Sequence, residues 1–299
     1  MYGYETQGEI QPPVNVLASR YASSEMVQLF SDDAKVVLMR QLWLDVMEQQ
    51  AALGLDIPQD AIEDYKAVVD FVDHDSIRER ERKSGHDVNA QINEFNALAG
   101  GHQYINLGMT SRDSTENVEQ FQIHEGLRII ESRVVATLGK FASRAVEYST
   151  IPMAGRSHNV AAQIITLGKR LSNPGEELLL GYEDLYHRRE SYPLRGIKGP
   201  VGTQQDMLDL FDGDETKVKD LEAQIAHNLG FRSVLGSVGQ VYPRSLDLKV
   251  VNTLHESVAG PSSFAKTLRL MAGNELVTEG FKEGQVGSNA MPHKMNART

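Results

Sequence analysis

A long stretch without proline runs from Ser114 to Tyr148 and limits the folds that this chain can adopt. Apolar side chains recur along it at the spacing of one helix face, at Val118, Phe121, Ile129, Val134, Leu138 and Phe141. Pro152 and Gly155 follow its end. Helices of globular proteins average about 11–12 residues, so a helix of this length must pack along other long helices or a second copy of the chain.

Other segments carry helical periodicity with recognisable start and stop signals. We expect helices from the N-cap Ser31 to Gly54, near 60–72, from about Val88 to Ala99 with Asp87 as cap, from about Asn159 to Glu190, from about Glu215 to Leu229, and from Pro243 to about Val277. Kinks or breaks are expected at Pro174 and Pro261. Residues 191–213, with four glycines and two prolines, predict loops.

Almost no segment alternates apolar and polar residues long enough to predict a sheet strand. The sequence therefore predicts an all-α protein, with an N-terminal helical domain over 1–112 and a central long-helix bundle over 113–299. A monomeric coiled coil is disfavoured because no strict heptad persists.

Composition excludes several classes of protein. The chain has no cysteine, which excludes disulfides, thiolate metal sites and a cysteine nucleophile. The formal net charge of −11 disfavours nucleic acid as a partner. No apolar run is long enough for a membrane span, and Met1–Glu5 does not begin a secretory signal, so a cytoplasmic protein is expected. No histidine spacing typical of a metal site occurs, so no metal is expected.

Three polar segments could carry chemistry. Thr110 and Ser111 stand at the predicted N-terminus of the long helix, where hydroxyls and free N–H groups favour an anion. His158 follows Arg156 and Ser157 at what we expect to be another helix start, and a histidine titrates near neutral pH. Ser288 lies in a glycine-flanked, polar loop over 282–296 that also holds a lysine. A capping pair, a lone histidine or a polar surface loop is each more often structural.

The combination of these segments outweighs that structural interpretation. Gly-Ser-Asn-Ala-Met-Pro-His-Lys-Met-Asn, residues 287–296, resembles the G-S-S-x-M-P-x-K-x-N loop of the fumarase/aspartase superfamily. Residues 108–117 are similar to its first conserved region, and 155–163 to its G-x-T-H-x-Q-x-A-Q region. The resemblance implies that Ser288 is the general base, that His158 is the general acid and that the Thr-Ser pair holds a substrate carboxylate. Asn289 replaces the second serine of the family pair.

Further stretches resemble the adenylosuccinate lyases within that superfamily. They are Arg20-Tyr21-Ala22-Ser23 with Arg40–Leu44, Gly85-His86-Asp87-Val88, Lys198-Gly-Pro-Val-Gly-Thr-Gln204 and Gly239-Gln-Val-Tyr-Pro-Arg244. Gly85 stands where these enzymes have arginine. The resemblance covers nearly all of 15–298. It implies the catalytic residues Ser288, His158, His86 and Lys294, and the substrate-binding residues Arg20, Tyr21, Asp87, Thr110, Ser111, Gln204, Asn289, Met291 and Asn296.

The implied reaction is an anti β-elimination that releases fumarate from adenylosuccinate, or from the succinylated aminoimidazole carboxamide ribotide of purine biosynthesis. It implies no cofactor, and it implies a homotetramer with each site built from three chains. Members of the family extend past this loop, so the C-terminal part of the bundle is expected to be missing here. The alternatives are another fumarate-releasing lyase, such as an argininosuccinate lyase, and a non-catalytic helical scaffold. The first alternative is disfavoured by Arg20-Tyr21 and His86-Asp87. The second is motivated by Gly85, by Asn289 and by the expectation that the C-terminal part of the bundle is missing.

Overall fold

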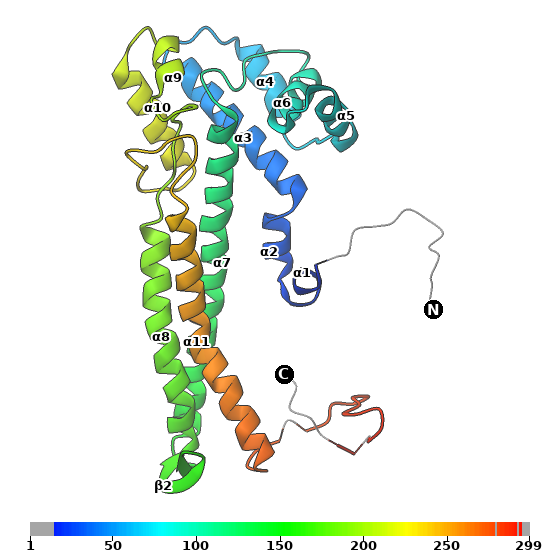
Figure 1. Ribbon diagram of the computed structural model, residues 1–299, viewed down its shortest axis with the longest axis vertical. Coiled ribbons are helices and arrows are strands. Elements are labelled where there is room, and N and C mark those ends of the chain that lie inside the picture. Colours follow the sequence, from blue (N-terminus) through cyan, green and yellow to red (C-terminus); the bar gives the residue numbers. More distant parts are fainter. Residues whose placement is uncertain (1–14, 279, 292, 295–299) are drawn as a thin grey trace. The chain divides into compact units, whose positions relative to one another are not determined.

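The computed structural model describes residues 15–278, 280–291, 293 and 294, and these residues are mostly helical (Figure 1). The helices are α1 (Val16–Tyr21), α2 (Ser24–Leu29), α3 (Asp32–Ala52), α4 (Gln59–Ala67), α5 (His74–Ser84), α6 (Asp87–Leu98), α7 (Ser111–Glu147), α8 (Leu167–Glu190), α9 (Gln205–Leu210), α10 (Glu215–Asn228) and α11 (Ser245–Gly273). The strands are β1 (Pro152–Ser157) and β2 (Val160–Thr166). The predicted all-α class is confirmed, with this one hairpin as a local exception.

The chain forms two compact units. Unit 1 comprises residues 1–129 and 191–243, and unit 2 comprises residues 130–190 and 244–299, so the division falls within α7. Across the described residues, no helix combines the length and the apolar character needed to cross a membrane. The expected domain boundary near residue 112 is a different division of the chain and stays a prediction.

The core of unit 1 lies around α3, whose start the sequence predicts correctly. Ser31 caps α3, its hydroxyl accepting the Ala34 N–H at 3.2 Å. The helix then buries a run of apolar side chains against α4, α6, α9, α10 and the first half of α7. The fully or nearly fully buried members of this core include Met39, Leu42, Trp43, Met47, Tyr65, Phe95, Ile197, Met207, Leu221 and Ile225.

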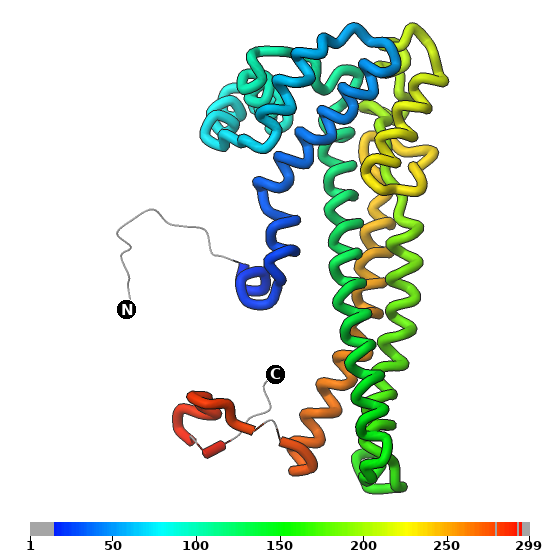
Figure 2. The backbone as a smooth tube through the Cα atoms, turned by 180° about the vertical axis from the view of Figure 1, so that it is seen from behind, coloured from blue at the N-terminus to red at the C-terminus, as the bar shows by residue number. Residues whose placement is uncertain are grey.

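In unit 2, the second half of α7, α8 and α11 run side by side (Figures 1 and 2). Their close approach depends on glycine. A Cβ at Gly181 of α8 would lie 2.8 Å from the Glu256 carbonyl oxygen, and one at Gly260 of α11 would lie 2.5 Å from the Pro174 carbonyl oxygen. Helices α8 and α11 continue through Pro174 and Pro261, so neither proline breaks its helix.

The expected helix from Asn159 to Glu190 is wrong over its first part, because residues 152–166 form an antiparallel hairpin and α8 begins at Leu167. The two turn residues of this hairpin, His158 and Asn159, have φ of 49° and 64°. Positive φ at both central residues is what a tight two-residue hairpin turn requires. The β-branched residues of β2 favour the extended backbone that follows. His158 therefore stands at a hairpin turn and not at a helix N-terminus.

Two other expectations need correction. Residues 205–210, expected as loop, form α9, and the expected helix near 60–72 ends at Ala67. Helix α5 was not predicted, because it is highly charged and buries only Ile77. Its start is fixed by Asp73, whose carboxylate accepts the Ser76 N–H at 2.9 Å.

Candidate active site

The predicted anion site at Thr110-Ser111 lies at the N-terminus of α7. The Thr110 N–H donates to Asp113 Oδ2 at 2.8 Å, and the Asp113 N–H donates to the Thr110 carbonyl oxygen at 2.9 Å. Asp113 therefore closes the first turn, and neither hydroxyl is needed for capping. Among the described residues, the hydroxyls of Thr110 and Ser111 have no hydrogen-bond partner, and both residues are half-buried. They can donate to an anion at the positive end of the helix.

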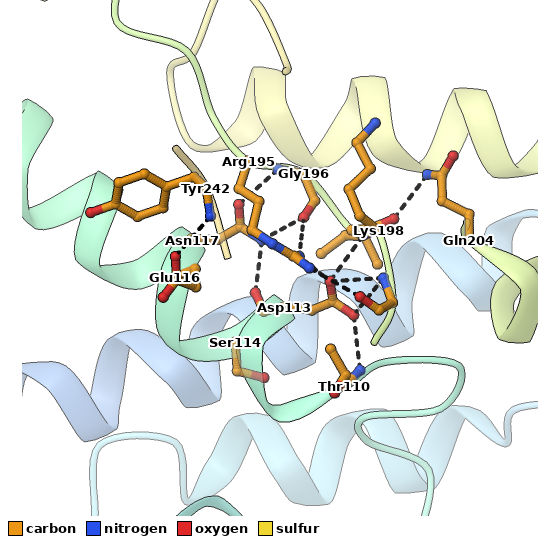
Figure 3. A network of polar contacts seen from close by, with 12 residues as sticks. Thr110, Asp113, Ser114, Glu116, Asn117, Arg195, Gly196, Lys198, Gln204 and Tyr242 are labelled. Atoms are coloured by element: carbon orange, nitrogen blue, oxygen red, sulfur yellow. Dashed lines mark hydrogen bonds and ion pairs between the residues drawn. The ribbon is translucent and has the colours of Figure 1, made fainter. Parts of the chain in front are cut away.

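The loop that carries Lys198 and Gln204 is held against the start of α7 (Figure 3). The Lys198 and Gly199 N–H groups donate to Asp113 Oδ1 at 2.9 and 3.1 Å. The guanidinium of Arg195 forms an ion pair with the same carboxylate, and both side chains are completely buried. Two segments that the sequence singled out separately are thus joined through one aspartate.

Gln204 is oriented by the same loop. Its amide Nε2 donates to the Ile197 carbonyl oxygen at 2.8 Å and to Glu222 Oε1 at 3.2 Å. Both partners are acceptors, so the amide oxygen is the atom that remains for a ligand. Glu222 also accepts from Lys198 Nζ at 2.6 Å. Burial raises the pKa of Glu222, and the hydrogen bond from Lys198 acts in the opposite direction.

The path of this loop requires glycine at two positions. Gly202 has φ of 86°, and a Cβ there would lie 1.8 Å from the Val238 carbonyl oxygen. Gly196 has φ of 85°, and a Cβ there would lie 2.3 Å from Glu222 Oε1. Side chains rarely adopt these backbone angles and would also collide, so the glycine spacing of this segment follows from packing.

The other predicted contacts of unit 1 are on exposed helix ends. Arg20 and Tyr21 end α1, and 77% of Tyr21 is exposed. His86 is the N-cap of α6, with its Nδ1 accepting the Asn89 N–H at 3.2 Å, so the expectation that Asp87 caps this helix is wrong. Asp87 is instead the first residue of α6. Gly85, which stands where the resembled enzymes have arginine, ends α5 with φ of 67°, a left-handed conformation that disfavours a side chain.

His158 belongs to unit 2, where it is exposed in the turn between β1 and β2. The turn is braced by Arg156, whose Nη1 donates to the Asn159 carbonyl oxygen at 2.9 Å. No helix N-terminus lies at His158, so the dipole expected there is not present. The imidazole is accessible for proton transfer to a bound molecule.

The loop that carries Ser288 is also in unit 2 and is largely exposed. The Ser288 hydroxyl oxygen accepts the Met291 N–H at 3.3 Å, and the Lys294 N–H donates to the Met291 carbonyl oxygen at 2.9 Å. Asn289, Met291 and Lys294 are exposed, while Asn296 lies outside the described residues. The loop thus turns tightly and presents the serine hydroxyl.

Within unit 1, the structure brings Thr110 and Gln204 into one hydrogen-bonded network through Asp113, Lys198 and Glu222, and Ser111 follows Thr110 as the first residue of α7. In unit 2 it does not join His158 to Ser288, since among the described residues neither side chain contacts the other through a hydrogen bond. One chain therefore shows the parts of the predicted site without a direct contact between acid and base.

A protein-family model described as Lyase matches residues 22–298. The chain belongs to this lyase family. The match confirms the predicted membership of the fumarase/aspartase superfamily. The chain is 35% identical to an adenylosuccinate lyase of Schistosoma mansoni over 285 residues and 35% identical to one of Saccharomyces cerevisiae over 287 residues. Each alignment covers 94% of this chain but 59% of the relative, so the chain spans about three-fifths of the relatives' length.

Solved structures show the same fold. A 3-carboxy-cis,cis-muconate lactonizing enzyme from Pseudomonas putida aligns with a TM-score of 0.78 at 19% identity, covering 94% of the present chain and 63% of that chain. A fumarate lyase from Mesorhizobium sp. BNC1 aligns with a TM-score of 0.73 at 22% identity, covering 85% and 59%. These alignments confirm the long-helix bundle of the superfamily.

Three residues that hold the unit 1 site together were not predicted from the sequence: Asp113, Arg195 and Glu222. A signal existed for Asp113, because an acidic residue three positions after Thr110 fits a helix N-terminal pattern. Arg195 and Glu222 carried no local signal, since their partners are far away along the chain.

Proposed function

We propose that the protein is an adenylosuccinate lyase, a carbon–nitrogen lyase that releases fumarate from adenylosuccinate to give AMP. The same chemistry would release fumarate from the succinylated aminoimidazole carboxamide ribotide. The observation that carries the proposal is the 35% identity to adenylosuccinate lyases along 94% of the chain. The matching family model spans residues 22–298, which include Thr110, His158 and Ser288.

In the proposed reaction, Ser288 removes a proton from the succinyl Cβ. The electron pair of that C–H bond forms the C=C bond of fumarate, and the pair of the Cα–N bond leaves with the purine amino nitrogen. His158 then protonates this nitrogen. The Met291 N–H at 3.3 Å from Ser288 Oγ supports a serine that carries negative charge while it acts as base. Lys294 and Asn296 are proposed to stabilise the carboxylate-centred dianion that forms first.

Substrate binding is proposed to use the remaining polar groups. The hydroxyls of Thr110 and Ser111 and the N-terminus of α7 would hold a succinyl carboxylate. Arg20 and Tyr21 would contact the phosphate, and His86 and Asp87 would lie near the phosphate and reaction centre. Gln204, Asn289 and Met291 would complete the contacts. The hydroxyls at 110 and 111, which have no hydrogen-bond partner in the described part of the chain, support the first of these roles.

We further propose a cytoplasmic homotetramer in which Thr110, His158 and Ser288 of each site come from three chains. The exposed apolar side chains of α8 and α11 support assembly: Leu179, Leu180, Leu248, Val251, Val258 and Leu270 are each more than two-fifths exposed. A monomer rarely leaves so many on long helices. We also propose that residues 1–112 form an N-terminal helical domain and that residues 113–299 belong to the central long-helix bundle.

The test is a fumarate-release assay on the purified full-length protein with adenylosuccinate and, separately, argininosuccinate. Release from adenylosuccinate alone is expected. Release from argininosuccinate alone would instead indicate a related lyase. Release from neither, with the protein folded and tetrameric, would contradict the enzymatic proposal and favour a non-catalytic scaffold.

A further inference from the structure

We propose that Asp113 and Arg195 are positioning residues, which hold the Thr110-Ser111 helix start and the Gln204 loop in one fixed arrangement for substrate. This inference rests on the proposed function, because it concerns two segments proposed to contact the substrate. Neither residue is itself placed against the substrate, and both are completely buried (Figure 3).

The Asp113 carboxylate joins the two segments directly. Its Oδ2 accepts the Thr110 N–H at 2.8 Å and the Gly199 N–H at 3.2 Å. Its Oδ1 accepts the Lys198 N–H at 2.9 Å and the Gly199 N–H at 3.1 Å. An ionised carboxylate forms charge-assisted bonds with each of these donors. The spacing between residue 110 and residues 198–199 is therefore set by one side chain.

Arg195 fixes the other side of the loop. Its guanidinium pairs with Asp113 and donates to the carbonyl oxygens of Gly196, Gly199 and Gly239 at 3.1, 3.0 and 3.2 Å. The planar fork of arginine suits several acceptors at once, which a lysine cannot match. Arg195 also neutralises Asp113, and a buried negative charge near the helix start would otherwise repel an anionic ligand.

Helix α7 presents a stripe of polar side chains to the backbone of Arg195 and Gly196. Asp113, Asn117 and Gln120 follow at helical spacing and share one face. Asn117 Nδ2 donates to the Gly196 carbonyl oxygen at 2.9 Å, and Asn117 Oδ1 accepts the Gly196 N–H at 2.9 Å. Gln120 Oε1 accepts the Arg195 N–H at 2.6 Å. The loop is thus docked through its own backbone, and its position depends on this stripe.

These contacts of the loop backbone also determine where Gln204 lies. The docked backbone sets the place of the Ile197 carbonyl oxygen, which accepts from the Gln204 amide. It also sets the place of Lys198, whose Nζ holds Glu222, the second acceptor of that amide. Glycine-rich loops have little rigidity of their own, so this loop needs contacts that hold it in place. A buried ion pair contributes little to overall stability. Positioning of the loop therefore explains why the Asp113–Arg195 pair is present.

The test is Asp113→Asn in the full-length protein, with Glu94→Gln as matched control. Glu94 also forms a completely buried ion pair in unit 1, with Arg40, and also accepts a backbone N–H, that of Asp73 at 3.0 Å. Both variants should lower the melting temperature. Only Asp113→Asn should lower kcat/KM for adenylosuccinate, by about 10–100-fold. Equal kinetics in the two folded variants would overturn the proposal.

Arg195→Lys provides a second variant that keeps the charge, in case Asp113→Asn does not fold. It should also lower kcat/KM by about tenfold or more. In addition, amide hydrogen exchange over 196–204 should become faster while exchange at Asp73 stays unchanged. Unchanged exchange over 196–204 would overturn the proposal. A wild-type protein that releases no fumarate would overturn the proposed function, while the exchange result would still decide whether the pair positions the loop.

Discussion

The indole N–H of Trp43 donates to the hydroxyl oxygen of Ser114 at 2.6 Å, in the completely buried interface of α3 and α7. Trp43 is the single tryptophan of the chain. A buried indole N–H without a partner is costly, so this bond fixes how the start of α7 packs on α3. It ties the helix that begins at the predicted anion site to the core of unit 1.

Ser114→Ala should therefore lower the free energy of unfolding by about 1–3 kcal/mol, the usual cost of leaving a buried donor unsatisfied. Denaturant unfolding followed by the fluorescence of Trp43 measures this directly. Ser143→Ala is the control, because the Ser143 hydroxyl is exposed and donates within its own helix turn, to the Lys140 carbonyl oxygen at 3.1 Å. Equal stabilities of the two variants would show that the Trp43 bond contributes nothing.

Gly181→Ala should destabilise unit 2, because its Cβ would lie 2.8 Å from the Glu256 carbonyl oxygen and 3.0 Å from Ser257 Cα in α11. Backbone atoms cannot move aside cheaply, so overpacking should cost about 1–3 kcal/mol. Gly139→Ala in α7 is the control, since nothing lies within 4 Å of its Cβ. It should instead stabilise by about 0.5–1 kcal/mol through helix propensity. Thermal unfolding of both variants compares the two effects, and a stable Gly181→Ala protein would contradict the close α8–α11 contact.

Local signals allowed the sequence to predict the long helices. The expected helix over 114–148 is α7, Ser111–Glu147, and the expected helix from Glu215 is α10, because periodicity and capping act over a few residues. The hairpin at 152–166 was missed since its turn depends on two residues with positive φ, a conformation that composition does not show.

Local motifs in the sequence predicted single residues of the candidate site but not the contacts that hold these residues in place. Thr110, Gln204 and Ser288 were identified from local motifs. Asp113 and Arg195 meet across a sequence separation of 82 residues, and Lys198 meets Glu222 across 24. Such pairings follow from the tertiary path of the 195–204 loop, which no local pattern specifies.

Glu222→Gln should change the pH dependence of stability in a defined direction. Burial raises the pKa of Glu222 above its ordinary value of 4.5, with Lys198 opposing the shift and Asp113 adding to it. The contribution of this group to stability is thus fully present below its unfolded pKa and is lost as pH rises through the raised folded-state pKa. Relative to wild type, Glu222→Gln should therefore gain stability as the pH is raised from below 4.5 towards neutral. Melting temperatures of both proteins across that range give the comparison, and the opposite trend would contradict the raised pKa.

The proposed roles of Ser288 as base and His158 as acid predict how two single variants of the full-length protein behave. Ser288→Ala should abolish turnover while substrate still binds, because the base is lost and the binding groups stay. His158→Gln should lower kcat by several orders of magnitude with the fold intact, because the leaving nitrogen is no longer protonated. Fumarate release and circular dichroism measure the two effects. Normal turnover in Ser288→Ala, or unchanged limbs of the pH–rate profile in His158→Gln, would contradict the respective assignment.

Mixing these two inactive proteins and allowing subunits to exchange should restore activity. We propose that each site takes Ser288 from one chain and His158 from another. In a random hybrid tetramer each of these residues is intact in half of the sites, so both are intact in about one site in four. Restored activity should therefore approach about a quarter of the wild-type value. The exposed turn of His158 and the exposed loop of Ser288, with no hydrogen bond between them among the described residues, fit a site completed by neighbouring chains. The control is a mixture without exchange, which should stay inactive. A full-length protein that is monomeric by light scattering, or exchanged mixtures that regain nothing, would show that each chain builds its own site.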